Sequence, residues 1–188
     1  MLGGVIDVTN GFNQQTGYKS CAFTGYRPQK MPFGFDEQDS RCIDFKNRLR
    51  KAIEELIGHG YSHFISGGAL GMDMFASETV IDLKRDYPWI ILEIACPFDG
   101  QASKWSREYQ NRYYRLMREA DITTHIGHEY TRSCMFRRNR YMVDNANLLL
   151  AAYDGQPGGT AMTVQYAENT RVPVQIVAPL SAACPTFQ

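Results

Sequence analysis

Two glycine-rich segments carry the residue types best suited to holding an anion. Residues 66–73 read Ser-Gly-Gly-Ala-Leu-Gly-Met-Asp and directly follow an apolar run, and residues 157–160 read Pro-Gly-Gly-Thr, three residues after another apolar run. Glycine permits positive φ and close backbone approach to a ligand. A helix beginning there exposes unpaired N–H groups and the positive end of its dipole, which favours phosphate. The alternative is that these glycines only permit tight turns, but the presence of two such turns favours ligand binding.

Arginines supply positive charge near the same segments. Arg137, Arg138 and Arg140 fall within four residues, and Arg27 stands in the segment Thr-Gly-Tyr-Arg-Pro. Guanidinium groups match phosphate oxygens through paired hydrogen bonds. On a helix, Arg137 and Arg140 share a face and Arg138 lies about 100° away. The alternative for this cluster is a solvated helix face, whereas the following proline restricts Arg27 to an extended conformation that helps to orient it.

Three further signals are weaker. Asp73 can hydrogen-bond a ribose hydroxyl or simply stabilise the first turn of its helix. His125 and His128 form an HxxH pair, but they fall at a predicted strand end, where positions i and i+3 face opposite sides, so no metal site is predicted. Aromatic residues between arginines in 105–117 suit base stacking, yet their helical spacing favours packing of an amphipathic helix on a sheet.

The elements that must position these residues alternate between apolar runs and amphipathic stretches. The runs predict strands at 20–24, 62–66, 89–96, 121–126, 146–153 and 172–177. The stretches predict helices at 37–58, 72–86, 103–119, 135–145 and 160–170. Such alternation predicts an α/β fold: one Rossmann-like three-layer α/β/α domain with a mostly parallel sheet of about six strands and right-handed crossovers.

In a parallel sheet, the segments that follow the strands meet at one edge. Here these segments are 25–28, 67–73, 97–101, 127–130 and 154–160, and all five contain glycine. The ligand crevice of open α/β sheets lies at this edge, where the strand order reverses. We therefore expect Thr160 to cap the last helix and its neighbours to line a binding site.

Length, charge and cysteine content limit the remaining possibilities. The 188 residues predict a single domain at 20–180, with residues 1–19 as a flexible arm or extra strand and residues 181–188 as a C-terminal tail. Lys plus Arg and Asp plus Glu both number 20, which argues against a general polyanion binder. Five scattered cysteines without a CxxC pair, and no expected signal peptide or membrane helix, predict a cytoplasmic protein.

The ordered motifs resemble the SLOG superfamily of Rossmann-like nucleotide-ligand proteins, which includes the DNA-processing protein DprA and the LOG phosphoribohydrolases. Segments 23–28, 64–78, 87–105 and 118–121 are similar to the YpsA/YoqJ-type branch, and the resemblance extends from about residue 21 to 177. The DprA pattern implies roles for Arg138, Asn139 and Arg140, and its SGxAxGID motif matches 66–73. LOG enzymes place an Arg-Lys pair at Arg138 and Asn139.

The same resemblance argues against catalysis. LOG enzymes follow their PGGxGT motif with a catalytic glutamate, but this chain has no carboxylate at the matching position, and Glu168 lies one helical turn further on. Hydrolysis of an N-glycosidic bond needs a positioned carboxylate. DprA proteins are longer, carry additional domains and bind single-stranded DNA through a basic surface, whereas this chain is neutral.

We therefore expect a module that binds or senses a nucleotide or nucleotide-derived ligand. A LOG-like hydrolase and a DprA-like accessory that binds single-stranded DNA are the alternatives. No catalytic or metal-binding residue and no other cofactor are predicted, no membrane contact is expected, and SLOG-type domains imply a homodimer. The expected ligand-binding residues are Thr24, Gly25, Tyr26, Arg27, Ser66, Gly67, Gly68, Ala69, Gly71, Asp73, Pro97, Arg138, Asn139, Arg140, Gly158, Gly159 and Thr160.

Overall fold

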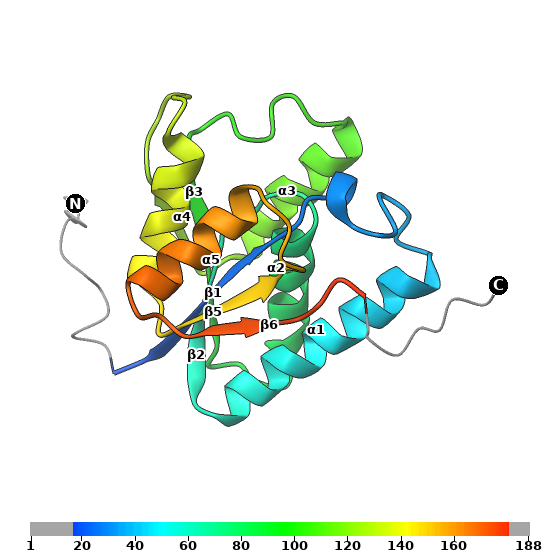
Figure 1. The fold of residues 1–188 in the computed structure, drawn as a ribbon, viewed down its shortest axis with the longest axis vertical. Helices are drawn as coiled ribbons and strands as arrows, with labels where there is room; N and C mark the ends of the chain where they lie inside the picture. Colours follow the sequence, from blue (N-terminus) through cyan, green and yellow to red (C-terminus); the bar gives the residue numbers. More distant parts are fainter. Residues whose placement is uncertain (1–16, 181–188) are drawn as a thin grey trace, which may run out of the picture.

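The structure, a computed structural model, describes residues 17–180 and contains a six-stranded sheet (Figure 1). The predicted tail and residues 1–16 of the predicted arm lie outside the described residues. The strands are β1 (Lys19–Gly25), β2 (Tyr61–Ser66), β3 (Ile91–Cys96), β4 (Ile122–His125), β5 (Leu148–Ala152) and β6 (Val174–Ile176). The helices are α1 (Ser40–Gly58), α2 (Met72–Leu83), α3 (Arg107–Glu119), α4 (Cys134–Asp144) and α5 (Gly159–Asn169), with a 3₁₀ turn at Pro28–Lys30.

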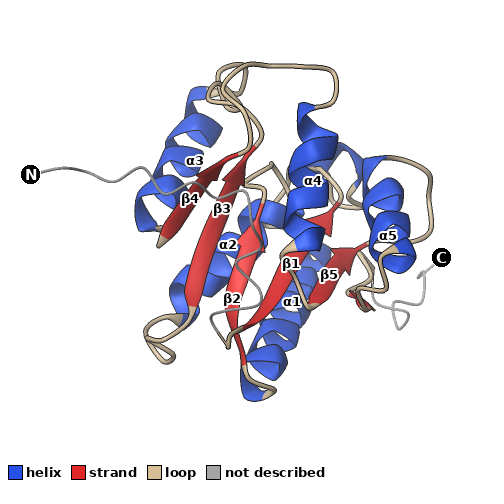
Figure 2. Ribbon diagram, turned by 90° about the vertical axis from the view of Figure 1, so that its left-hand side faces the viewer, coloured by secondary structure: helices blue, strands red, loops and turns tan. Residues whose placement is uncertain are grey.

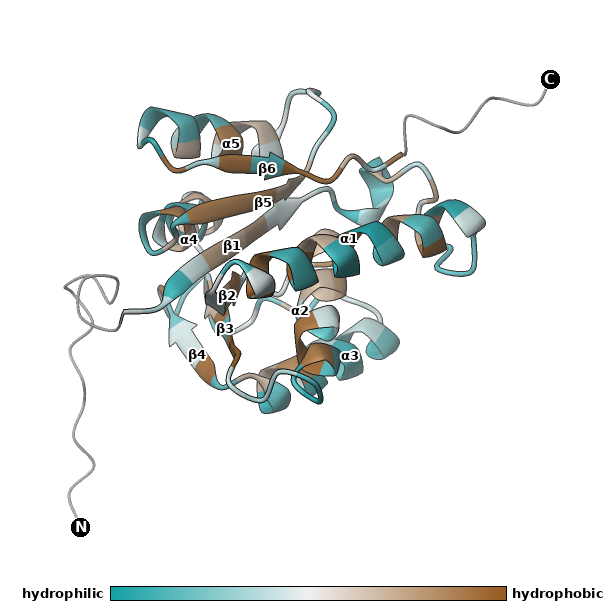
Figure 3. Ribbon diagram, turned by 90° about the horizontal axis from the view of Figure 1, so that it is seen from below, coloured by the Kyte–Doolittle hydropathy of each residue, from teal (hydrophilic) through white to brown (hydrophobic). Residues whose placement is uncertain are grey.

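All neighbouring strands are parallel, in the order β4-β3-β2-β1-β5-β6. Helices α1, α2 and α3 lie on one face of the sheet, and α4 and α5 lie on the other (Figures 2 and 3). The predicted α/β fold with three layers is confirmed. None of the described helices is long and apolar enough to cross a membrane.

Local chemistry explains where the predicted helices and strands were too long. The third helix begins at Arg107 rather than 103, because the Ser106 hydroxyl accepts the Tyr109 N–H and caps it there. The third strand begins at Ile91 rather than 89, because the Ile90 N–H bonds the Tyr87 carbonyl in a turn. In both places a local hydrogen bond replaces the regular pattern that periodicity alone predicts.

Apolar residues fill both interlayer spaces. The larger core includes Phe23, Phe64 and Leu92 from the sheet and Phe45 and Phe75 from α1 and α2. A smaller core lies between the sheet and helices α4 and α5, and β5 is apolar along its length (Figure 3). The central strands are therefore buried on both faces, as the continuous apolar runs in the sequence indicate.

One charged group interrupts the buried sheet. The Glu93 carboxylate of β3 contacts His63 Nε2 at 2.8 Å and accepts hydrogen bonds from the hydroxyls of Thr124 and Tyr141 at 2.7 and 2.8 Å. Burial alone would raise the pKa of Glu93, but these partners outweigh burial and hold the pKa below its ordinary value. Because the pKa is lower in the folded state, ionised Glu93 stabilises the fold at pH values above 4.5, the ordinary pKa that it has in the unfolded chain.

Replacing Glu93 with glutamine is expected to lower the free energy of unfolding by about 1–3 kcal/mol at about pH 7, because the acceptor of these hydrogen bonds loses its charge. The wild-type advantage is lost as the pH falls through the depressed pKa, so the two proteins should differ less in acid than at about pH 7. Urea unfolding at both pH values measures this. Glu54→Gln, in an exposed pair with Arg50, is the control. An equal loss at both pH values would contradict the ionic role of Glu93.

Candidate functional site

A cavity of about 350 Å³ lies at the point where the strand order reverses. From β1 the chain adds β2, β3 and β4 on one side and then returns to place β5 on the other side of β1. The lining residues belong to the segment after β1, the segment after β2, helix α4 and the start of α5. Ligands of open α/β sheets bind at this position.

Ten of the residues expected to bind a ligand line this cavity. They are Thr24, Gly25, Tyr26, Arg27, Ala69, Asp73, Arg138, Asn139, Gly159 and Thr160. Four lining residues were not predicted, namely Phe23, Gln29, Lys30 and Met135. Lys30 could have been found, because it lies three residues beyond Arg27 in the same segment.

Seven expected residues are absent from the cavity lining, namely Ser66, Gly67, Gly68, Gly71, Pro97, Arg140 and Gly158. Arg140 is exposed, and its guanidinium lies 4.8 Å from the ring centroid of Tyr166. The Arg140 side chain therefore packs on the outer surface of α4 and α5. A Cβ added at Gly127 would lie 3.4 Å from the carbonyl oxygen of Pro97, which shows that Pro97 lies beside the segment after β4. These two residues therefore contact neighbouring segments rather than the cavity.

The first glycine turn uses its own N–H groups internally. Gly68 N–H donates to the Ser66 hydroxyl at 3.2 Å, and Ala69 N–H donates to Asp73 Oδ2 at 3.3 Å. At Gly67, an added Cβ would lie 1.6 Å from Arg138 Nη1. The expectation that these amides are free to hold an anion is therefore corrected, because the chain supplies its own carboxylate and the glycine makes room for an arginine.

Asp73 and Arg138 form a buried charged pair at the base of the cavity. Only 7% of Asp73 and 5% of Arg138 is exposed, and Arg138 Nη1 lies 3.8 Å from Asp73 Oδ2. Arg138 Nη1 also donates to the Gly67 carbonyl at 2.5 Å. Burial has the largest influence on both groups: it raises the pKa of Asp73 and lowers the pKa of Arg138, and their mutual attraction opposes both shifts.

Asn139 uses both its amide oxygen and its amide nitrogen in hydrogen bonds within the chain. Its Oδ1 accepts from Arg138 Nε at 2.8 Å, and its Nδ2 donates to the Thr163 hydroxyl at 2.9 Å. Thr163 in turn donates to the Gly159 carbonyl at 3.0 Å. Asn139 therefore links α4 to the first turn of α5 and fixes the direction of Arg138.

The start of α5 opens on the cavity. Gly158 is the N-cap, with φ of 150°, and no side chain caps the helix. The predicted capping role of Thr160 is wrong, because the helix begins at Gly159 and Thr160 lies within its first turn. The first N–H groups of a helix lack intrahelical acceptors, so Gly159 and Thr160 bring the positive end of α5 to the cavity wall.

A clasp joins the segments after β1 and β5 beside the cavity. The Tyr26 hydroxyl donates to the Asp154 carboxylate, and this hydrogen bond holds the pKa of Asp154 below its ordinary value. Lys30 Nζ donates to the Pro157 carbonyl at 2.9 Å and lies 5.8 Å from the centroid of the Tyr26 ring. The clasp places the Lys30 ammonium close to the start of α5.

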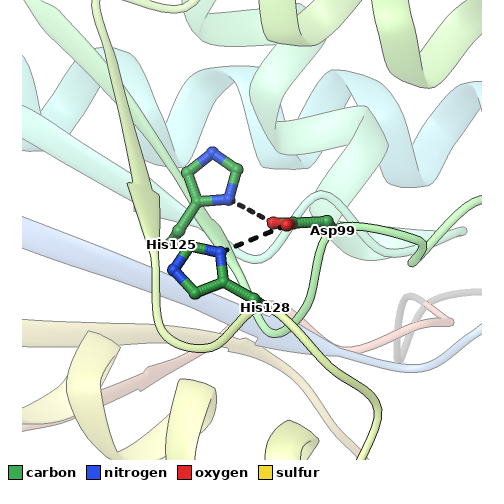
Figure 4. Close-up of side chains that lie close together, drawn as sticks. All are labelled: Asp99, His125 and His128. Carbon is green, nitrogen blue, oxygen red and sulfur yellow. Dashed lines mark hydrogen bonds and ion pairs between the residues drawn. The ribbon is translucent and has the colours of Figure 1, made fainter.

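His125 and His128 converge on one carboxylate (Figure 4). The expectation that they face opposite sides is wrong, because β4 ends at His125 and the chain turns before His128. Their rings are nearly parallel, with 6.2 Å between centroids, and both Nδ1 atoms bond Asp99 at 2.7 and 3.2 Å. The geometrical reason for discounting a metal site at HxxH is therefore removed.

Comparison with known proteins identifies the family of this chain. The family model described as the YspA SLOG family, named YpsA, matches residues 21–180. The chain belongs to this family. Relatives include the SPbeta prophage-derived protein YoqJ of Bacillus subtilis, 34% identical over 68% of this chain and 82% of YoqJ. A UPF0398 protein of Bacillus velezensis is 28% identical over 81% of this chain and 85% of its own length.

Two solved structures share the fold of this YpsA-family chain. DNA processing protein A of Streptococcus pneumoniae superposes with a TM-score of 0.58 at 14% identity, over 85% of this chain and 50% of that protein. The Helicobacter pylori protein, described for its single-stranded DNA binding mode, gives 0.57 at 15% identity, over 84% of this chain and 64% of its own. The chain thus spans less than two thirds of either protein, and these similarities show the fold alone.

Proposed function

We propose that this SLOG domain binds or senses a nucleotide or nucleotide-derived ligand in the cavity at the carboxyl end of β1, beside α4 and the start of α5. The observation that carries the proposal is the convergence of three cationic side chains and an uncapped helix start on one cavity. Its volume of about 350 Å³ falls within the range of ligand sites. The cations are Arg27, Lys30 and Arg138.

The charges are graded from the base of the cavity to its mouth. Arg138 is buried and its charge is balanced by Asp73, so it can orient a ligand but adds little net positive charge to the cavity. Arg27 is exposed, and within the described chain its guanidinium makes no hydrogen bond or ion pair. Lys30 is fixed by Pro157 near the start of α5. A ligand phosphate is therefore proposed to lie between Arg27, Lys30 and the first N–H groups of α5.

Binding is favoured over hydrolysis by the carboxylates of the site. Among the lining residues Asp73 alone carries a carboxylate, and it is engaged by Ala69 and Arg138. Glu168 is exposed near the far end of α5. A general acid must reach the leaving group, and neither residue is free at the cavity to do so.

The proposal is tested by calorimetry and thermal unfolding with nucleoside mono-, di- and triphosphates and a single-stranded oligonucleotide. One nucleotide should raise the melting temperature, with a stabilisation that grows with the logarithm of its concentration over its dissociation constant, and chromatography should recover it intact. Released base would instead indicate a hydrolase. Strong oligonucleotide binding that falls steeply with salt would indicate the DNA-binding alternative.

Replacing Arg27 with alanine is expected to weaken nucleotide binding about 10- to 100-fold, because a charge-assisted hydrogen bond is lost. The free energy of unfolding should change by less than about 0.5 kcal/mol, since the side chain is exposed. Calorimetric titration and urea unfolding measure the two effects. Arg50→Ala, on α1, is the control and should keep wild-type affinity. Unchanged affinity in Arg27→Ala would remove Arg27 from the site.

Two further expectations belong to the same proposal. The four cysteines in the described chain are all buried and unpaired, which suits a reducing compartment, and we propose the cytoplasm. Homodimer formation stays a prediction, and light scattering of the ligand-free and ligand-bound protein tests it.

A further inference from the structure

Three metal-ligating side chains meet at the sheet edge, outside the cavity. Asp99 lies in the segment after β3, His125 ends β4 and His128 lies in the next segment (Figure 4). One potential ligand atom from each residue lies within 4.8 Å of the other two. None of the three lines the cavity, so this cluster is separate from the proposed nucleotide site.

The spacing of the three donors fits a small cation. Metal–ligand bonds of about 2.0–2.2 Å in a tetrahedral arrangement put neighbouring ligand atoms about 3.3 Å apart. The Nδ1 atoms of His125 and His128 lie 2.7 and 3.2 Å from the two oxygens of Asp99. Figure 4 shows both Nδ1 atoms directed at the carboxylate. An ion can therefore enter after small side-chain movements.

The backbone holds the two segments together without an ion. Asp99 N–H donates to the His128 carbonyl at 3.3 Å, and Ile126 N–H donates to the Cys96 carbonyl at 2.8 Å. These two backbone hydrogen bonds hold together the segments that carry Asp99, His125 and His128. A site whose ligands are already positioned loses less conformational entropy when the ion binds.

The histidine–aspartate contacts themselves are weak competitors for a metal ion. The side chains of His125, His128 and Asp99 are 44, 82 and 52% exposed. Exposed ion pairs contribute little to stability, so an entering ion displaces little. Imidazole nitrogen combined with one carboxylate suits Zn²⁺ and its neighbours, whereas Mg²⁺ and Ca²⁺ prefer oxygen ligands alone.

We propose that Asp99, His125 and His128 bind one divalent transition-metal ion of the Zn²⁺ class, with its remaining coordination positions open to solvent. Three protein ligands and open positions are the arrangement that lets a bound ion hold water or an anionic ligand. The site joins the segments after β3 and β4, and it stands independently of the proposed nucleotide binding.

Equilibrium dialysis of the full chain against Zn²⁺, without nucleotide, tests the proposal. The wild-type protein should bind one equivalent saturably, and excess Mg²⁺ should not displace it. Co²⁺ should bind at the same place and give visible absorption bands that Zn²⁺ removes. His128→Ala should weaken Zn²⁺ binding by more than the about tenfold that loss of an outer-shell partner costs. Asp99→Asn should weaken it as well, because the charge is lost.

His59→Ala is the matched control, because His59 is an exposed histidine at the end of α1, and it should bind Zn²⁺ as the wild type does. All these residues are exposed, so circular dichroism should show unchanged folding in each variant. Absence of stoichiometric Zn²⁺ binding would overturn the proposal and leave a simple His–Asp ion pair. Wild-type affinity in His128→Ala, or displacement by Mg²⁺, would overturn it too.

Discussion

Arg138→Met is expected to lower the free energy of unfolding by about 3–5 kcal/mol, because removal of one partner leaves a buried charge uncompensated. Arg138 is 5% exposed. Within the described chain, its guanidinium is the only cationic group within ion-pair distance of the Asp73 carboxylate. Its loss also strips a hydrogen bond from the Gly67 carbonyl. Urea unfolding at about pH 7 measures the change.

The pH dependence of this loss has a defined sign. Burial raises the pKa of Asp73 above its ordinary value of 3.8, and Arg138 opposes that rise. In the variant the pKa of Asp73 rises further. At low pH the carboxyl is protonated and its burial costs little stability. As the pH rises through this pKa the carboxyl ionises, and the folded state is destabilised. The loss in Arg138→Met should therefore be smaller at about pH 3 than at about pH 7.

Two matched variants separate the charge effect from lost packing. Adding Asp73→Asn to Arg138→Met removes the unpaired charge, so the double variant should be more stable than Arg138→Met alone at about pH 7. Arg137→Met, on the same helix but exposed, should change the free energy of unfolding by less than about 0.5 kcal/mol. A double variant no more stable than the single one would show that the penalty does not come from the carboxylate.

The fold was predictable because its central strands are buried on both faces. Runs such as 89–96 and 146–153 are almost wholly apolar, and glycine-containing segments separate them from amphipathic stretches. Strand order was not predictable in the same way, because it depends on which helix covers which face. The reversal beside β1, which locates the cavity, appears only once β5 pairs with β1.

The site was predicted in part, and its errors share a cause. Sequence spacing places Arg138 and Arg140 on α4 but does not say which turns inward, because that depends on how Met142 and Val143 pack. Likewise, a glycine turn predicts free amides, but only the folded chain shows Asp73 returning to accept them. Long-range partners of this kind leave no local pattern in the sequence.

Gly71→Ala should have an effect of comparable size for a different reason. Gly71 has φ of 88°, which L-residues rarely adopt, and an added Cβ would lie 2.5 Å from the Tyr26 carbonyl oxygen and 3.1 Å from Arg27 Cα. Both contacts are with backbone, so no side chain can swing away. We expect a loss of more than about 3 kcal/mol in the free energy of unfolding, in the upper range for single substitutions.

Gly60→Ala supplies the control, because Gly60 has nearly the same φ, 85°, and nothing within 4 Å of an added Cβ. It should cost only the conformational strain, about 1–2 kcal/mol. The difference in the free energy of unfolding between the two variants measures how tightly the start of α2 packs against the segment after β1. A hydrogen bond of 3.2 Å from Met72 N–H to the Tyr26 carbonyl joins the same two segments. Equal losses would mean that this segment yields freely, and Arg27 would then not be held in place at the cavity.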